Sequence, residues 1–141
     1  MPATPFGSLI PEILGLKVFA VVGASQNPSK YGHMVYMTLK QAGYRVYPVN
    51  PHADTIDGDT VYPTLDNLPE VPECVVTVVP SAVTEQVVRE AGRLGVRYLW
   101  MQPGSESEAA VHAAHAAGLR TVYGGPCIMV AVKTAQKRSG A

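Results

Sequence analysis

Lys17-Val-Phe-Ala-Val-Val-Gly23-Ala-Ser-Gln-Asn-Pro-Ser-Lys-Tyr-Gly32 is the most informative stretch of the sequence. Its first part, residues 18–22, is apolar without interruption, which is typical of a strand buried on both faces in a parallel sheet. Its second part consists of small and polar residues between two glycines, a composition typical of a turn. The stretch therefore predicts a buried strand, a tight turn and the start of a helix.

The same pattern returns along the chain. Further apolar runs of strand length lie at Tyr44–Val49, Cys74–Val79, Val96–Met101 and Leu119–Tyr123. Helical spacing of apolar residues separates most of them, and Gly43, Gly95 and Gly118 each stand where a helix would end before the next run. Helices that alternate with buried strands predict a single α/β domain, a doubly wound, mainly parallel sheet of about five strands with helices on both faces.

The ends of the domain follow from this pattern. We expect residues 1–16 to form a short N-terminal helix or extension packed on the sheet, residues 17–133 the domain itself, and residues 134–141 a flexible basic tail. Residues 51–72 are rich in proline and acids, so we expect a long connection with one short strand near Thr60–Tyr62. The segment Ser105-Glu-Ser-Glu108 matches a capping box, which predicts Ser105 as a helix N-cap.

The composition excludes several classes of protein. The chain has 141 residues, 47% of them hydrophobic, and its 11 basic residues balance its 11 acidic residues. A neutral chain with a sizeable core is not expected to capture nucleic acid or an anionic membrane by its overall field. Two cysteines make neither a disulfide framework nor a four-cysteine zinc site, and the N-terminus does not look like a signal peptide. We therefore expect a reduced, cytoplasmic protein that holds any anion by a local arrangement.

The turn after the first strand is the predicted site of such an anion. In doubly wound sheets, ligands bind beyond the carboxyl ends of the strands. A small-residue turn that opens onto a helix leaves backbone N–H groups free at the positive end of the helix dipole. Ser25 adds a hydroxyl and Lys30 a positive charge. The turn predicts a phosphate cradle, with an ordinary polar loop as the alternative.

The common nucleotide fingerprints are missing from this turn. Ser25 stands where the dinucleotide motif requires its second glycine. The second strand ends in Val49-Asn50-Pro51, without the acidic residue that would grip a ribose hydroxyl, and Asp54 comes three residues too late. A Gly-Lys-Ser/Thr sequence is also absent, which excludes a Walker A loop.

Five short motifs occur along the chain. They are Gly23-Ala-Ser-x-x-Pro28-x-Lys30-x-Gly32, Val49-Asn50-Pro51, Val61-Tyr-Pro-Thr-Leu65, Trp100-Met-Gln102-Pro-Gly104 and Cys127-Ile-Met129. Together they resemble the motifs of the small stand-alone CoA-binding domain proteins, whose fold is also that of the CoA-binding domain of the succinyl-CoA synthetase alpha subunit. They occur in the family's order and span roughly residues 10–133.

The resemblance implies a Rossmann-like domain that binds coenzyme A. It assigns the pyrophosphate to the first turn, the adenosine to the end of the second strand, further contacts to the end of the third strand, and the rest of the ligand to the tip of the fourth. The residues so assigned are Gly23, Ala24, Ser25, Pro28, Lys30, Tyr31, Gly32, Asn50, Pro51, Val79, Pro80, Gln102 and Gly104.

Two segments depart from the family's pattern. Many members carry Asp-x-Phe-Arg at the third strand, where this chain has Thr77-Val-Val-Pro80. Many also carry Asp-Arg-Cys before the last helix, where this chain has Gly125-Pro126-Cys127, closer to the Gly-Pro-Asn-Cys turn of the synthetase subunit. Two arginines that could serve the ligand or the fold are therefore absent.

Other reactive side chains have simpler interpretations. His112 and His115 share a helix face, but no third ligand lies nearby in sequence, so we expect surface histidines and no metal. His33 is expected to approach a phosphate as a cation or to have a capping or solvent role, and His52 to lie at the rim. Cys127 at a helix start is expected to be buried and structural rather than nucleophilic.

Cys74 is expected in the core, and no catalytic residue is expected. The sequence thus favours a protein that binds coenzyme A or an acyl-CoA without catalysis of its own, as a carrier, a sensor or a partner subunit. A partner enzyme subunit or a second copy of the chain would be its protein partner. The alternatives are an NAD(P)- or other nucleotide-dependent enzyme or enzyme subunit, and a degenerate Rossmann scaffold for protein contacts.

Overall fold

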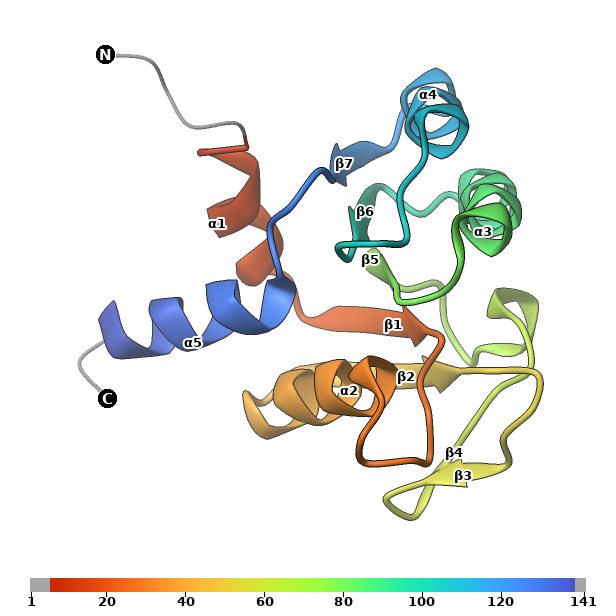
Figure 1. Cartoon of the computed structure of the whole chain (residues 1–141), viewed down its shortest axis with the longest axis vertical. Coiled ribbons are helices and arrows are strands. Elements are labelled where there is room, and N and C mark those ends of the chain that lie inside the picture. Colours follow the sequence, from red (N-terminus) through yellow and green to blue (C-terminus); the bar gives the residue numbers. More distant parts are fainter. Residues whose placement is uncertain (1–5, 139–141) are drawn as a thin grey trace.

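The computed structural model describes residues 6–138 and contains a five-stranded parallel sheet (Figure 1). The strands are β1 (Val18–Val22), β2 (Arg45–Val49), β5 (Cys74–Thr77), β6 (Tyr98–Met101) and β7 (Arg120–Val122). Their order is β2-β1-β5-β6-β7, so the chain winds outward from β1 first to one edge and then to the other. The predicted α/β doubly wound fold is confirmed.

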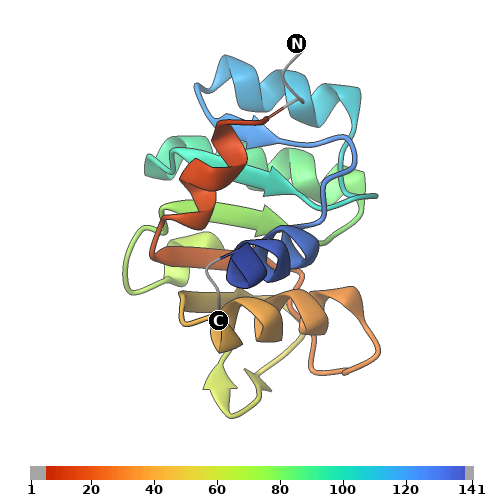
Figure 2. The same ribbon diagram turned by 90° about the vertical axis from the view of Figure 1, so that its left-hand side faces the viewer.

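Helices cover both faces of the sheet, as Figures 1 and 2 show. On one face lie α1 (Leu9–Leu14), α2 (Tyr31–Gln41) and α5 (Ile128–Arg138). On the other face lie α3 (Ser81–Leu94) and α4 (Glu108–Ala116). Side chains that alternate along β1 enter the two cores in turn: Phe19 and Val21 pack under the first group, and Ala20 under the second. This two-sided burial explains why the strand is continuously apolar.

The edge strand β2 accommodates a proline without losing a hydrogen bond of the ladder. Pro48 has no N–H, but its backbone faces away from β1, where its carbonyl accepts a hydrogen bond from the N–H of Tyr62 (2.9 Å). Tyr62 thereby covers part of this edge and forms an isolated bridge with Val49. The strand predicted at Thr60–Tyr62 is therefore divided. Thr60 belongs to β4 (Asp59–Thr60), which pairs with β3 (Thr55–Ile56), and Tyr62 forms only the bridge to Val49.

The helix ends correct two expectations. Helix α4 begins at Glu108, and its N-cap is Ser107, whose hydroxyl accepts the N–H of Ala110 (3.0 Å). Ser105 is instead buried and donates to the carbonyl of Gln102 (2.8 Å), so its prediction as the cap is wrong. Helix α5 continues to Arg138, which places residues 134–138 of the predicted tail in a helix; residues 139–141 lie outside the described residues.

The N-terminal extension is partly described. Its residues 9–14 form α1, which packs against β7 and α5, whereas residues 1–5 lie outside the described residues. None of the helices within residues 6–138 combines the length and the apolar character that crossing a bilayer requires. Gly43, Gly95 and Gly118 follow three helices with positive φ values of 97°, 85° and 79°, as their positions predicted.

A polar cluster fastens the β3–β4 hairpin to α2. The Lys40 ammonium lies 2.6 Å from a carboxylate oxygen of Asp59 and 3.0 Å from one of Asp57, and the Tyr36 hydroxyl donates to Asp59. The hydrogen bond from Lys40, followed by that from Tyr36, lowers the pKa of Asp59 below its ordinary value of 3.8. Burial, and then the same carboxylate, raises the pKa of Tyr36.

This cluster predicts a pH dependence of stability. A carboxyl whose pKa is depressed by folding stabilises the native state above its unfolded pKa, and that stabilisation disappears as the pH falls through the folded pKa. Asp59→Asn should therefore lower the urea midpoint at neutral pH, by a modest amount because the pair is partly exposed. The difference from the parent should shrink as the pH falls below 3.8 and through the depressed folded-state pKa of Asp59. Urea titrations at several pH values measure this.

The pairing with Lys40 supplies the control. In the double variant Lys40→Met/Asp59→Asn, the two losses at neutral pH should be less than additive, because either change alone breaks the same contact. A difference between parent and Asp59→Asn that is the same at every pH would contradict the assignment.

Candidate functional site

Two glycines shape the turn that follows β1. Gly23 has a φ of 101°, and a Cβ atom there would lie 2.2 Å from the carbonyl oxygen of Val78. A Cβ atom on Gly32 would lie only 1.9 Å from the carbonyl oxygen of Gly23. Real Cβ atoms do not approach so closely, so both positions require glycine. The first turn of α2 and the segment after β5 are thereby drawn against the end of β1.

The turn is ordered by its own short polar side chains. The Ser25 hydroxyl accepts the N–H of Asn27 (3.1 Å), and the Asn27 side chain accepts the N–H of Ser29 (3.0 Å). The N–H of Lys30 donates to the carbonyl of Asn27 (3.0 Å). Serine and asparagine commonly make such local bonds to backbone N–H groups, which explains their presence here.

Helices α2 and α3 both begin beside this turn without a side-chain cap. The N-cap of α2 is Lys30, whose side chain has no acceptor, and the N-cap of α3 is Pro80. Helix α4, in contrast, is capped by Ser107. An uncapped N-terminus leaves its first N–H groups and the positive end of its dipole for water or a ligand. Helices α2 and α3 follow the neighbouring strands β1 and β5, so their two uncapped N-termini favour an anion between them.

A cleft of about 370 Å³ lies at this point of the sheet. It is the place where the strand order reverses, between β1 and β5, the usual ligand site of doubly wound sheets. The predicted residues that line it are Gly23, Ser25, Lys30, Tyr31, Gly32, Val79, Pro80 and Gly104. Val78, Pro103 and Ser105 also line it and were missed. Their positions directly after β5 and β6 were the available signal.

The remaining predicted residues lie elsewhere. Ala24 is buried beneath the turn, and Pro28 and Pro51 are exposed away from the cleft lining. The Asn50 amide donates to the carbonyl of Ala24 (2.7 Å), and its side-chain oxygen accepts the N–H of His52 (2.8 Å). Asn50 therefore braces the turn from the tip of β2.

A smaller cavity of about 280 Å³ adjoins the cleft. Tyr31, Val78 and Pro103 line both the cleft and the cavity. Gln102 and Cys127 line the cavity but not the cleft. The Gln102 side chain accepts the N–H of Ile128 (2.7 Å) and donates to the sulfur of Cys127 (3.4 Å).

The two cysteines differ in exposure. Cys127 is half-buried at the start of α5, which corrects the expectation that it is buried. Cys74 lies in the core as expected, and burial raises the pKa of its thiol.

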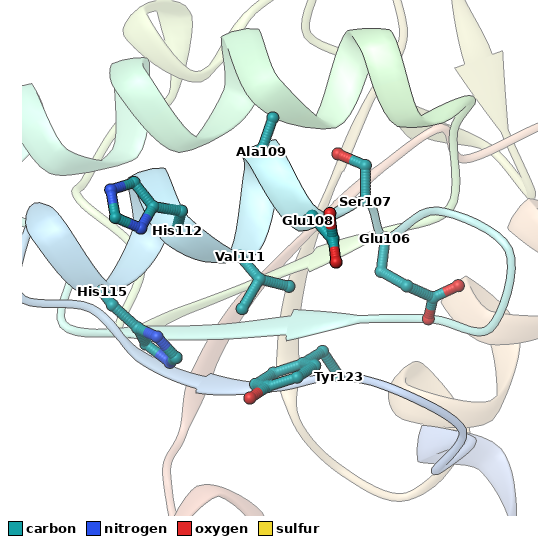
Figure 3. A pocket seen from close by; sticks show the side chains of 8 residues that line it. All are labelled: Glu106, Ser107, Glu108, Ala109, Val111, His112, His115 and Tyr123. Carbon is teal, nitrogen blue, oxygen red and sulfur yellow. The ribbon is translucent and has the colours of Figure 1, made fainter.

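A larger hollow of about 690 Å³ lies along α4 and is a poor site for an anion (Figure 3). Its lining carries the carboxylates of Glu106 and Glu108 without a lysine or arginine. His115 lies against the ring of Tyr123, whereas His112 points away from it (Figure 3). The two histidines therefore do not converge, and residues 6–138 contain no group of three potential metal ligands. Charge favours the smaller cleft, where Lys30 is the charged lining residue.

Comparison with known proteins agrees with this geometry. A family model described as CoA binding domain matches residues 17–133. The chain belongs to the CoA binding domain family. The resemblance found in the sequence is thereby confirmed, and the turn after β1 is the glycine turn of a CoA binding domain.

Relatives of this CoA binding domain differ greatly in size. The alpha subunit of ADP-forming acetate–CoA ligase II from Pyrococcus furiosus is 35% identical over 79 residues, which cover 55% of this chain and 17% of that one. YneT of Bacillus subtilis is 33% identical over 128 residues, which cover 90% of this chain and 94% of that one. The chain spans only 12% to 19% of the length of the acetate–CoA ligases that it matches.

A solved structure shares the whole architecture. A hypothetical protein from Pyrococcus horikoshii is 33% identical and superposes with a TM-score of 0.85, over 90% of this chain and 89% of that one.

The close approach of Gly32 to Gly23 can be tested by adding one methyl group. Gly32→Ala should destabilise the fold by about 1–3 kcal/mol or more, because the backbone atoms that it would overlap are held by β1. Gly15→Ala is the matched control, since its Cβ would meet its neighbours at ordinary distances of 3.5 Å and beyond. Thermal unfolding of both variants measures the difference, and equal stability would contradict the packing described.

Proposed function

We propose that this protein binds coenzyme A or an acyl-CoA, with the pyrophosphate in the cleft after β1. The observation that carries the proposal is the meeting of the glycine turn, two uncapped helix N-termini and Lys30 around a cleft without a lining carboxylate. These groups offer backbone donors and one positive charge to a polyanion. Membership of the CoA binding domain family supports the choice of ligand.

The ligand would extend beyond the cleft in two directions. A CoA molecule is much larger than a space of about 370 Å³, so its two ends would lie over the rim. The adenosine would lie near Asn50 and Pro51 at the tip of β2. The other arm would pass Val79 and Pro80 toward Gly104 and the adjoining cavity with Gln102.

We further propose that the domain has no catalysis of its own. The cleft offers two serines, a lysine and a tyrosine among small and apolar residues. The half-buried thiol of Cys127 receives a hydrogen bond from the Gln102 amide, which is not a base. A carrier, a sensor or a subunit that works beside a partner suits such a site. A partner subunit is suggested by the Pyrococcus furiosus relative, which is named as an alpha subunit; a homodimer is the alternative.

The cellular setting is part of the same proposal. Cys74 and Cys127 are both free thiols, which suits a reducing cytoplasm.

Calorimetry with CoA, dephospho-CoA and NAD tests the ligand. We expect CoA to bind and NAD to bind much more weakly, because Asn50 at the end of β2 is engaged with Ala24 and offers no carboxylate to a ribose. A folded sample that gives no heat with either form of CoA would refute the proposal. Tighter binding of NAD would favour the nucleotide-dependent enzyme.

The role of Lys30 can be tested separately. Lys30→Ala should weaken CoA binding by about 1–3 kcal/mol, the range of a charge-assisted hydrogen bond. Lys17→Ala is the control, because Lys17 precedes β1 and therefore lies at the amino ends of the parallel strands, opposite to the cleft. An unchanged dissociation constant for Lys30→Ala would remove this residue from the site.

A further inference from the structure

Three successive carbonyl groups of the turn are held against the protein. The oxygen of Gly23 lies against Gly32 at the start of α2. The oxygen of Ala24 accepts the Asn50 amide (2.7 Å), and the oxygen of Ser25 contacts Nδ1 of His33 (2.9 Å). The turn is therefore clamped from two sides, by the tip of β2 and by the first turn of α2.

The clamps fix the direction of the N–H groups that follow. A trans peptide is planar, so its N–H points opposite to its C=O, and the described chain has no cis peptide bond. The N–H of Ser25, a residue that lines the cleft, therefore points away from Asn50, and the N–H of Gln26 points away from His33. Within residues 6–138, neither N–H has a hydrogen-bond acceptor.

We propose that His33 is a positioning residue, which holds the Ser25–Gln26 peptide with its N–H toward the bound anion and its carbonyl oxygen away. This inference rests on the proposed function. Without the imidazole, that peptide is free to rotate and present its carbonyl oxygen, the negative end of its dipole, to the cleft. His33 is well placed because it follows Gly32 directly and lies in the first turn of α2.

The contact also specifies a tautomer. A carbonyl oxygen only accepts hydrogen bonds, so Nδ1 of His33 must carry a hydrogen. A neutral His33 then has Nε2 without a hydrogen, and a protonated His33 keeps the same bond. The side chain thus acts as a donor to Ser25, and His33 is not among the residues that line the cleft.

Two substitutions of His33 distinguish the effect of its hydrogen bond on CoA affinity from the effect of its ring size. His33→Phe keeps an aromatic ring but removes the donor, and it should weaken CoA binding about tenfold, as expected for one lost hydrogen bond. His33→Asn restores a donor and should recover most of the affinity. His112→Phe, on α4, is the matched control and should bind as the parent does. A His33→Phe affinity equal to that of the parent would overturn the proposal.

Titration with inorganic pyrophosphate, followed by the amide NMR signals of Ser25 and Gln26, distinguishes this inference from the choice of ligand. Shifts in the parent that are lost in His33→Phe and regained in His33→Asn support positioning, even if CoA does not bind. Absence of such shifts in the parent overturns it. If a variant fails to fold, a nitrogen-15 NMR spectrum of the His33 ring in the parent protein still tests the inference, because it shows which ring nitrogen carries the hydrogen. Hydrogen on Nδ1 is expected, and hydrogen on Nε2 alone would overturn the contact.

Discussion

The structure depends on the contact between the α-carbon of Gly32 and the carbonyl oxygen of Gly23. This contact leaves no room for a side chain, so it sets how closely α2 approaches the end of β1. The short distance directs the uncapped end of α2 at the turn and places Lys30 at the cleft. Gly23 makes a second close approach to the segment after β5. The two contacts together place the start of α2 and the segment after β5 on either side of the candidate site. This site lies between β1 and β5, where the strand order reverses.

Local dipoles, rather than net charge, favour an anion at the candidate site. The chain is neutral, and the larger hollow on its surface carries carboxylates. At the cleft, the positive ends of α2 and α3, the N–H groups of the turn and one lysine act over a few ångströms. The family resemblance places an arginine near the end of the third strand in many members, where this chain has Pro80 before an uncapped helix. In the proposed site, the start of helix α3 would then offer backbone donors in place of that side chain.

The sequence predicted the sheet well because a strand that is buried on both faces is apolar at every position, as residues 18–22 show. It predicted the turn because only glycine tolerates the contacts at positions 23 and 32. It failed at Ser105, because Ser107 two residues later makes an equally good cap and only the packing of Ser105 under Gln102 decides between them. The bracing roles of Asn50 and His33 were also hidden, since they depend on contacts across 26 and 8 residues of the chain.

A crystal structure of the protein with coenzyme A would show whether the turn after β1 holds the pyrophosphate. We expect pyrophosphate oxygens within hydrogen-bond distance of the N–H groups of Ser25, Gln26 and Gly32 and of the Lys30 ammonium. We also expect the Ser25 carbonyl to remain in contact with His33. Coenzyme A bound in the hollow beside Glu106 and Tyr123, or bound with its pyrophosphate away from the turn, would contradict these expectations.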